Sequence, residues 1–324
     1  MEPDRPPELI EGPGVQGEPK ELRSALRLTP AEQWQLMIPQ MGYMALLRQL
    51  RAFDKAGIPE SVANKVAQRI ADPAQVARSR QLPFRFYSAY INAPSLRWGQ
   101  ALEQALQACL PNVPELPGRT LILIDTSGSM ESFLSERPDS RPRRGKGRRG
   151  GSPDEPPPVR PMRVQAAALL GLALALKNPE AVDVWGFADG QFRVTGIGPG
   201  QSLLKAVEAF SRCTGNVGHG TQIALAARMC YGAHDRVCIF TDMQTFGPGG
   251  GFGFYSSYGV GDVSAAVPAR VPVYAFNLAG YEASAMPVGG GNRHELGGLS
   301  DATFTMIPVI EAGRSARWPW EQAA

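Results

Sequence analysis

The sequence is poor in cysteine and in long apolar runs, and each shortage excludes a class of protein. Its four cysteines show no paired spacing, so we expect reduced thiols rather than a disulfide framework. The longest apolar run, residues 166–176, is too short to cross a bilayer. Residues 1–14 are acidic and proline-rich, and they lack the basic head and apolar stretch of a secretion signal. We therefore expect a cytoplasmic protein that has no membrane partner.

What is present indicates a folded chain of more than one domain. Hydrophobic residues make up 43% and charged residues 19%, which is typical of a globular protein. A length of 324 residues favours about two domains. Glycine and proline concentrate in an acidic tail and two loops, which we expect not to pack into a core: residues 1–19, 135–163 and 247–261. The predicted domains are residues 20–114 and residues 115–324, and the second contains both loops.

The first domain has the pattern of short helices. Thr29, Pro30 and Glu32 form a helix-start signal, because threonine caps, proline fits the first helical position and glutamate favours the first turn. Apolar residues then recur at helical spacing over residues 34–38 and 44–50. Prolines divide the rest into short segments separated by turns. The pattern predicts stacked helical hairpins of the HEAT-like kind.

The second domain alternates strands with helices. Residues 121–124 are a continuous apolar run, as expected for a strand buried on both faces. Further strands are expected at residues 182–187, 237–241, 271–277 and 304–309, and helices at residues 164–177, 202–210, 223–231 and 262–267. This alternation predicts a doubly wound, mainly parallel sheet of the α/β class. Ligands of such folds bind at the carboxyl ends of the strands.

An oxygen-rich motif, Asp-Thr-Ser-Gly-Ser, follows the first strand directly. Its Asp125, Ser127 and Ser129 alternate along a turn, so they can converge at the carboxyl edge of the sheet. Thr221, near a helix start, and Asp242, after a strand, are expected at the same edge. Carboxylate and hydroxyl oxygens suit a hard divalent cation: Mg²⁺, with Mn²⁺ or Ca²⁺ as alternatives. The five residues predict a metal site, and a capped turn without metal is the alternative.

This set of residues resembles the metal-ion-dependent adhesion site of the von Willebrand factor A domain. By that resemblance Ser127 and Ser129 ligate the cation directly, while Asp125, Thr221 and Asp242 bind it directly or through water. The family keeps one coordination position open for an acidic group of a partner protein. The resemblance therefore implies an adhesive site rather than a catalytic one.

The helical domain resembles the last part of the TROVE module of the Ro autoantigen and of bacterial Ro-like proteins. Residues 38–51 and 78–86 carry the resemblance, and residues 241–246 are similar to the Ro version of the metal-site strand end. The resemblance covers residues 28–310. It implies that small noncoding Y RNAs, and the single-stranded ends of misfolded RNAs, are bound by a ring of helical repeats that the A domain closes.

The chain departs from that family in the length of its helical part. Residues 1–118 precede the first strand and hold enough helical sequence for about two hairpins, whereas the family ring needs many more. We therefore expect an N-terminally truncated module. Its ring is completed by a second chain, by self-association, or not at all.

Two sets of basic residues are candidate RNA contacts. The first set lies in the helical domain: Arg48, Arg51, Arg78, Arg80 and Arg85. Helix capping and ion pairs with the A domain are the alternative roles. The second set lies in the insert, residues 135–163: Arg141, Arg143, Arg144, Lys146, Arg148 and Arg149. A solvated insert that binds nothing is the alternative there. Aromatic residues in the loop 247–261 either stack on bases or are simply solvated.

The net charge of +3 conceals an uneven distribution. Residues 20–114 carry 12 basic and 6 acidic side chains, and the insert carries 9 and 4, whereas residues 1–19 carry 1 and 5. The basic parts suit phosphate, and the acidic remainder of the A domain suits a cation.

We therefore expect a non-enzymatic, Ro-like RNA-binding protein of a ribonucleoprotein, acting on small noncoding or misfolded RNA. Its metal site would hold an acidic group of a protein partner. The alternative is a metal-dependent protein-interaction module, an adaptor or assembly subunit, that binds no RNA. Metal-dependent hydrolysis is the weakest interpretation, because no suitable general base accompanies the cation.

Overall fold

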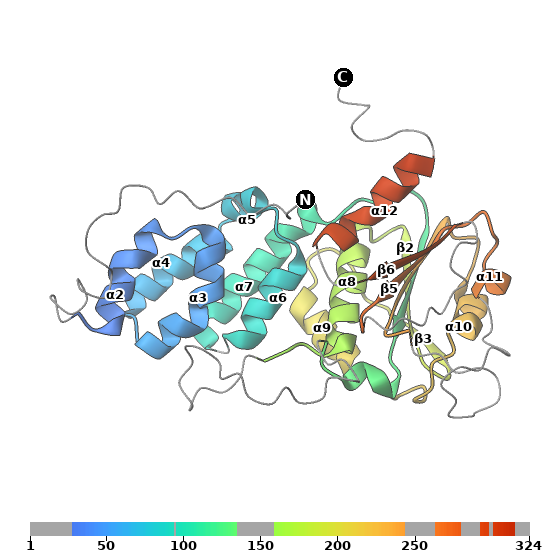
Figure 1. Cartoon of the computed structure of the whole chain (residues 1–324), viewed down its shortest axis with the longest axis horizontal. Coiled ribbons are helices and arrows are strands. Elements are labelled where there is room, and N and C mark those ends of the chain that lie inside the picture. Colours follow the sequence, from blue (N-terminus) through green and yellow to red (C-terminus); the bar gives the residue numbers. More distant parts are fainter. Residues whose placement is uncertain are drawn as a thin grey trace, which may run out of the picture.

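The computed structural model describes residues 28–93, 95–134, 159–243, 263–279, 292–297 and 301–314. They form a helical block that lies beside an α/β domain (Figure 1). Both parts confirm the fold class expected from the sequence. The acidic tail, the six basic residues of the insert and the loop 247–261 lie outside the described residues.

The helical block is built from short helices that begin at the expected signals. Its helices are α2 (Pro30–Met37), α3 (Tyr43–Ala56), α4 (Glu60–Ala71), α5 (Pro73–Ser79), α6 (Pro83–Asn92) and α7 (Leu96–Cys109), with 3-10 turns η1 (Ile38–Gln40) and η2 (Leu110–Asn112). Helix α2 starts with a capping box, in which Thr29 and Glu32 each accept a hydrogen bond from the other's backbone N–H. Prolines begin α5 and α6, because a residue without an N–H fits the first helical position.

Helix α7 organises the core of this block by packing against α4, α5 and α6. Trp98 of α7 is fully buried, and its Nε1 donates a hydrogen bond of 2.9 Å to Asp54 Oδ2. Its ring centroid lies 6.5 Å from that of Phe53 on α3. An indole buried with its N–H satisfied ties α3 to α7.

The α/β domain contains a six-stranded sheet of order β3-β2-β1-β4-β5-β6. Its strands are β1 (Thr120–Asp125), β2 (Val182–Phe187), β3 (Gln191–Arg193), β4 (Arg236–Thr241), β5 (Val273–Asn277) and β6 (Arg293–Gly297). All neighbouring pairs are parallel except β2 and β3. The central strands β1 and β4 are buried along their whole length, as the continuous apolar runs predicted.

Helices cover both faces of the sheet. They are α8 (Arg163–Lys177), α9 (Leu203–Ser211), α10 (Ile223–Cys230), α11 (Val263–Ala266) and α12 (Asp301–Arg314). One face of the sheet packs on α8, and the other packs on α10 and α11. Helix α8 lies so close to β1 that a Cβ on Gly171 would come within 2.7 Å of Ile124 Cδ1. Glycine at this position permits the close approach.

A single hydrophobic core joins the helical block to the sheet. It runs from Phe53 and Trp98 through α8 to Ile122 and Phe240 of the sheet. Helix α8 contacts both α6 and β1, and α7 contacts α9. The block therefore packs directly on the α/β domain (Figure 1).

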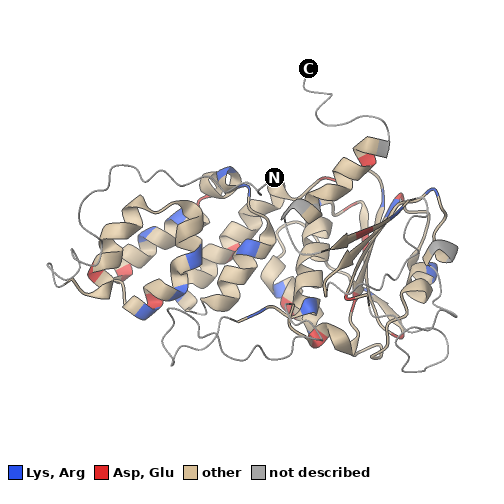
Figure 2. Cartoon of the chain, in the orientation of Figure 1, with Lys and Arg blue, Asp and Glu red and all other residues tan. Residues whose placement is uncertain are grey.

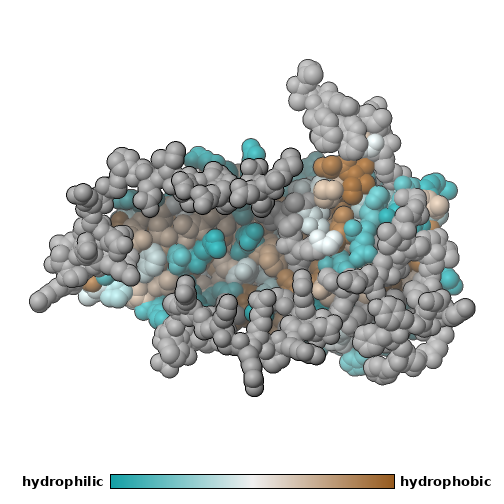
Figure 3. All heavy atoms as spheres, viewed as in Figure 1, coloured by the Kyte–Doolittle hydropathy of each residue, from teal (hydrophilic) through white to brown (hydrophobic). Residues whose placement is uncertain are grey.

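The strand expected at residues 304–309 is wrong, because these residues belong to helix α12. Ile307 is fully buried, and Glu311, four residues on, binds Arg236 of β4. That spacing places both side chains on the same side of a helix, toward the sheet. The edge position of the sheet is taken instead by β6, which the sequence did not predict, and β3 was missed as well. Met306 of α12 is exposed, and this helix shows hydrophobic surface in Figure 3.

No helix among the described residues is long and apolar enough to span a membrane.

Candidate functional site

The candidate metal site is centred on the carboxyl ends of two neighbouring parallel strands. Asp125 is the last residue of β1, and Asp242 follows directly after β4. Both carboxylates are fully buried. Thr241 Oγ1 donates a hydrogen bond of 2.6 Å to Asp125 Oδ2, so the two strand ends are joined at this point. Topology thus brings together two carboxylates that are 117 residues apart in the sequence.

The turn after β1 carries the two serine candidates. The backbone N–H of Ser127 donates to Asp125 Oδ1 at 2.8 Å, and this closes the turn on the carboxylate. The chain then enters the 3-10 turn η3 (Gly128–Glu131). The hydroxyl oxygens of Ser127 and Ser129 lie 3.2 Å apart. The alternation expected from the sequence therefore does place both hydroxyls on one side of the turn.

A second loop brings Thr221 to the same edge. Gly128 N donates to His219 O at 3.3 Å, which holds this loop against the turn after β1. Asp189 Oδ2 accepts hydrogen bonds from the N–H groups of His219 and Gly220, at 3.0 and 3.1 Å. A Cβ on Gly220 would collide with the Asp189 carboxylate. Asp189, which follows β2, is a positioning residue that the sequence did not single out.

Arg163 is a cation within this group that the sequence did not single out either. It is the first residue of α8, and its side chain is only 3% exposed. Its Nη1 lies 2.8 Å from Asp242 Oδ2 and donates at 3.4 Å to the Ser129 backbone O. Arg163 therefore bridges the turn after β1 to the end of β4.

Burial dominates the electrostatics of Asp125. The pKa of this carboxyl is raised to about 7, chiefly by burial and to a smaller extent by the neighbouring Asp242 charge. Hydrogen bonds from Thr241 and Ser127 act in the opposite direction, because they stabilise the ionised form. A nearby cation would stabilise the ionised form of this carboxyl and so lower its raised pKa.

The donor set fits a hard cation. Two carboxylates and three hydroxyls provide oxygen ligands only, and four of the five residues are buried while Ser129 is half-buried. Within the described ranges, no three His, Cys, Asp or Glu side chains are grouped so that they could hold a metal ion. The candidate site therefore depends on its hydroxyl groups.

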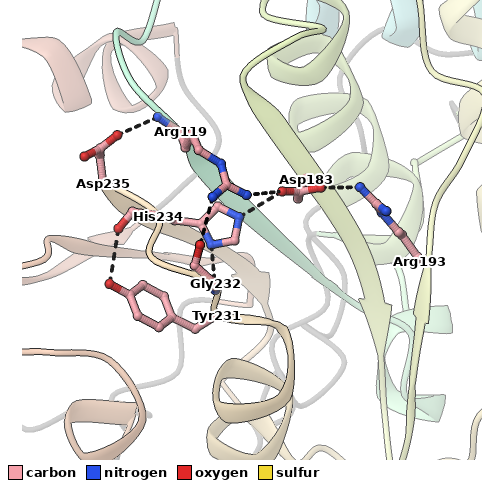
Figure 4. Close-up of polar contacts among 7 residues, drawn as sticks. All are labelled: Arg119, Asp183, Arg193, Tyr231, Gly232, His234 and Asp235. Atoms are coloured by element: carbon pink, nitrogen blue, oxygen red, sulfur yellow. Dashed lines mark hydrogen bonds and ion pairs between the residues drawn. The ribbon is translucent and has the colours of Figure 1, made fainter.

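A different polar cluster lies at the amino ends of the strands, and it links these strand ends to one another (Figure 4). Asp183 of β2 accepts from Arg119 Nη2 at 3.1 Å, pairs with His234 Nε2 at 3.0 Å and is also bound by Arg193. Burial alone would raise the pKa of Asp183, but the hydrogen bonds from His234, Arg119 and Arg193 outweigh it and lower the pKa. The cluster ties the starts of β1, β2 and β4 together.

The candidate RNA-binding arginines of the helical block lie mainly on its surface. Arg48, Arg78, Arg80 and Arg85 are exposed, and Arg51 is half-buried. Arg48 and Arg51 follow Met44 at helical spacing, so the three share one side of α3. Figure 2 shows basic residues on several helices of the block.

A shallow hollow of about 450 Å³ lies between the start of α3 and the end of α5. Residues from both helices line it, among them Tyr43, Met44 and Arg78. The structure thus brings Arg78 close to the side of α3 that carries Arg48. The six basic residues of the insert lie outside the described residues.

The fold and the site together define a class: helical hairpins packed on a doubly wound α/β domain with an oxygen-rich cluster at its carboxyl edge. Residues 16–97 match the sequence model of the TROVE domain, so the resemblance to a Ro-type TROVE protein is confirmed over this segment. The structure is similar to the crystal structure of the Deinococcus radiodurans Ro (RSR) protein, with a TM-score of 0.59 and 21% sequence identity. The similarity covers 87% of this chain and 58% of that one, so this chain spans little more than half of it. A comparison with curated proteins gave no match.

Proposed function

We propose that this protein is a Ro-like RNA-binding protein that acts in a ribonucleoprotein and is not an enzyme. The TROVE match over residues 16–97 carries the proposal. The matched helices include the exposed Arg48, Arg78, Arg80 and Arg85, and arginine neutralises backbone phosphate with little dependence on sequence. The RNA is small and noncoding, similar to Y RNA, or it is the single-stranded end of a misfolded RNA.

The oxygen cluster at the sheet edge would hold a divalent cation, Mg²⁺ or alternatively Mn²⁺ or Ca²⁺. Ser127 and Ser129 would contact it directly, and Asp125, Thr221 and Asp242 directly or through water. Bound there, the cation supplies a positive charge with an open coordination position for an acidic group of a partner protein. The buried, oxygen-only donor set supports this proposal.

RNA binding is tested by fluorescence anisotropy with a labelled small structured RNA at two salt concentrations. The double variant Arg48→Ala/Arg78→Ala should bind about tenfold more weakly and show a salt slope smaller by about 2, because two phosphate contacts are lost. Arg212→Ala is the matched control, since Arg212 is an exposed arginine of the α/β domain that pairs with Glu208. A wild-type protein that binds no RNA even at low salt would contradict the proposal.

The insert is proposed as a second, sequence-independent RNA contact. Neutralising Arg143, Arg144, Arg148 and Arg149 by glutamine in the full chain should lower RNA affinity and reduce its salt dependence. Equal RNA affinity in this variant and the wild type would leave the insert with the alternative role of a solvated loop.

A metal-dependent protein-interaction module without RNA is the second candidate. One observation favours it: all five residues of the oxygen cluster belong to the α/β domain, and none comes from the helical block. This candidate predicts an EDTA-sensitive protein partner and no RNA in the purified protein. The Ro-like proposal predicts co-purified RNA, and a helical ring that is completed by a second chain, by self-association, or not at all. Light scattering with and without RNA measures that stoichiometry.

A further inference from the structure

The hollow in the helical block lies where the start of α3 meets the end of α5, and its volume is about 450 Å³. Tyr43, Met44 and Ala45 line it from α3, and Arg78 and Ser79 line it from α5. These residues all fall within the segment that matches the TROVE domain. A volume of this size is usual for a site that holds a small molecule or one unit of a polymer.

Hydrogen bonds and packing hold the walls of the hollow in place. The Tyr43 hydroxyl donates to Ile70 O at 2.8 Å, and its ring centroid lies 6.3 Å from that of Phe86 in an edge-on contact. On the other wall, Ser79 Oγ donates to Val76 O at 2.7 Å. Because both walls are fixed by contacts within the protein, little ordering is needed when a ligand enters.

The lining of the hollow is mainly apolar, and its charge is positive. Tyr43 and Met44 are half-buried, so an aromatic ring and a thioether contribute to the surface. Among the described residues that line it, only Arg78 is charged, and its side chain is exposed. Arg48 lies one helical turn beyond Met44, about 6 Å further along α3. An apolar hollow beside two arginines suits a ligand with a flat apolar part and negative charge next to it.

A nucleotide of single-stranded RNA has both of these parts. Its base stacks on aromatic and apolar side chains, and a phosphate flanks it on each side. A paired base does not fit, because its faces are covered by neighbouring bases and its edge is bonded to the other strand. The surrounding block also suits phosphate, since residues 20–114 carry 12 basic and 6 acidic side chains.

We propose that this hollow holds one unpaired base of the bound RNA, and that Arg78 contacts the phosphate beside that base. The inference rests on the proposed function, because it names the part of the RNA that the helical block recognises. Phosphate contacts supply affinity for any strand, whereas the hollow adds affinity only for a strand with an exposed base. The helical block therefore distinguishes single strands from duplexes.

Gly42 allows the hollow to be filled while the fold is kept. It lines the hollow as the N-cap of α3, with φ −69° and ψ 160°, and a Cβ at this position would meet no atom within 4 Å. Asparagine is a favoured N-cap residue, so Gly42→Asn should not lower the thermal unfolding midpoint. Gly198→Asn is the matched control, because Gly198 lies in the α/β domain and a Cβ there would also meet no atom within 4 Å.

The test measures fluorescence anisotropy of the full chain with two labelled strands of equal length, an oligoadenosine and an abasic strand that has the same phosphates. The wild type should bind the oligoadenosine about tenfold more tightly than the abasic strand. Gly42→Asn should abolish this difference, Met44→Ala should reduce it, and Gly198→Asn should keep it. Arg78→Gln should weaken binding of both strands by a similar factor, because both use the same phosphate contact.

The outcomes separate this inference from the proposed function. Equal affinity of the wild type for the two strands overturns the inference, and RNA binding then stands on phosphate contacts alone. A difference that survives in Gly42→Asn also overturns it, because the base is then bound elsewhere. Loss of the difference in Gly198→Asn does the same, since the effect is then not local to the hollow. Absence of binding to the small structured RNA as well as to both strands overturns the proposed function together with the inference.

Discussion

Thr241 donates a hydrogen bond of 2.6 Å from its hydroxyl to Asp125 Oδ2, and so joins the ends of β4 and β1 beneath the candidate metal site. The same hydroxyl oxygen accepts from Met243 N at 3.2 Å, next to Asp242. One buried side chain therefore holds the Asp125 carboxylate and the backbone of the turn that carries Asp242.

Replacing Thr241 by valine should destabilise the protein by about 1–3 kcal/mol, because Asp125 loses a donor and Met243 N loses an acceptor in a buried setting. The free energy of unfolding in urea measures this loss. Thr214→Val is the control, since Thr214 Oγ1 donates to Ser211 O at a half-buried position in the loop after α9 and contacts neither carboxylate of the site. If the two variants lost equal free energy of unfolding, the hydrogen bonds of the Thr241 hydroxyl would contribute no more to stability than that of Thr214.

Cation affinity should fall as the pH is lowered. The pKa of Asp125 is raised to about 7, first by burial and then by the Asp242 charge, so below that pH the cation must displace a proton from the carboxyl. The apparent affinity for Mg²⁺ is expected to drop by about tenfold per pH unit well below this pKa and to level off above it. Calorimetry at constant ionic strength measures this. A pH-independent affinity would contradict proton competition at Asp125.

Asp189→Ala should weaken cation binding while changing global stability little. Asp189 is exposed, but its carboxylate holds His219 N and Gly220 N, and these place Thr221 at the edge of the sheet. Loss of such an outer contact reduces metal affinity by about 10- to 100-fold. Asp235→Ala is a matched control, because Asp235 accepts from Arg119 N at the opposite edge. We expect no change in metal affinity for that variant.

The cysteines should differ sharply in reactivity. Burial raises the pKa of the Cys238 thiol to about 12 and that of Cys230 to about 11, so neither supplies thiolate near neutral pH. Cys109 is buried as well, whereas Cys213 is partly exposed. Ellman's reagent should therefore label one thiol rapidly in the native protein and all four after unfolding. Cys213→Ser should abolish the rapid phase, and a rapid phase that survives this change would contradict the assignment.

The sequence predicted the elements whose local signals agree with their surroundings. Thr29 and Glu32 cap α2, and the uninterrupted apolar run of β1 could be buried only at the centre of a sheet. Strand β3, with three residues, and β6, with the polar sequence Arg-His-Glu-Leu-Gly, have no such signal, and pairing with neighbours decides their conformation. Residues 304–309 read locally as a strand, yet burial of Ile307 and the Glu311–Arg236 pair favour a helix.

Some residues of the candidate site could be predicted from the sequence, and others could not. Asp125, Ser127, Ser129, Thr221 and Asp242 were grouped from topology alone, because strand ends share one edge of a parallel sheet. Arg163 is the last residue of the proline-rich, basic insert, and nothing in the sequence distinguishes it from the other basic residues there. Asp189 follows β2 as an isolated carboxylate, and only its hydrogen bonds to the loop before α10 reveal its part.

Helix α8 acts as a common wall between the helical block and the sheet, since it is buried almost throughout and contacts both. Because the core is continuous from the helical block through α8 to the sheet, we expect thermal unfolding to be a single cooperative transition. Whatever docks at the Arg163 end of that wall is thereby held in a constant orientation to whatever the helices bind. The protein would then fix the relative orientation of two partners, one bound by the α/β domain and one by the helical block, without direct contact between them.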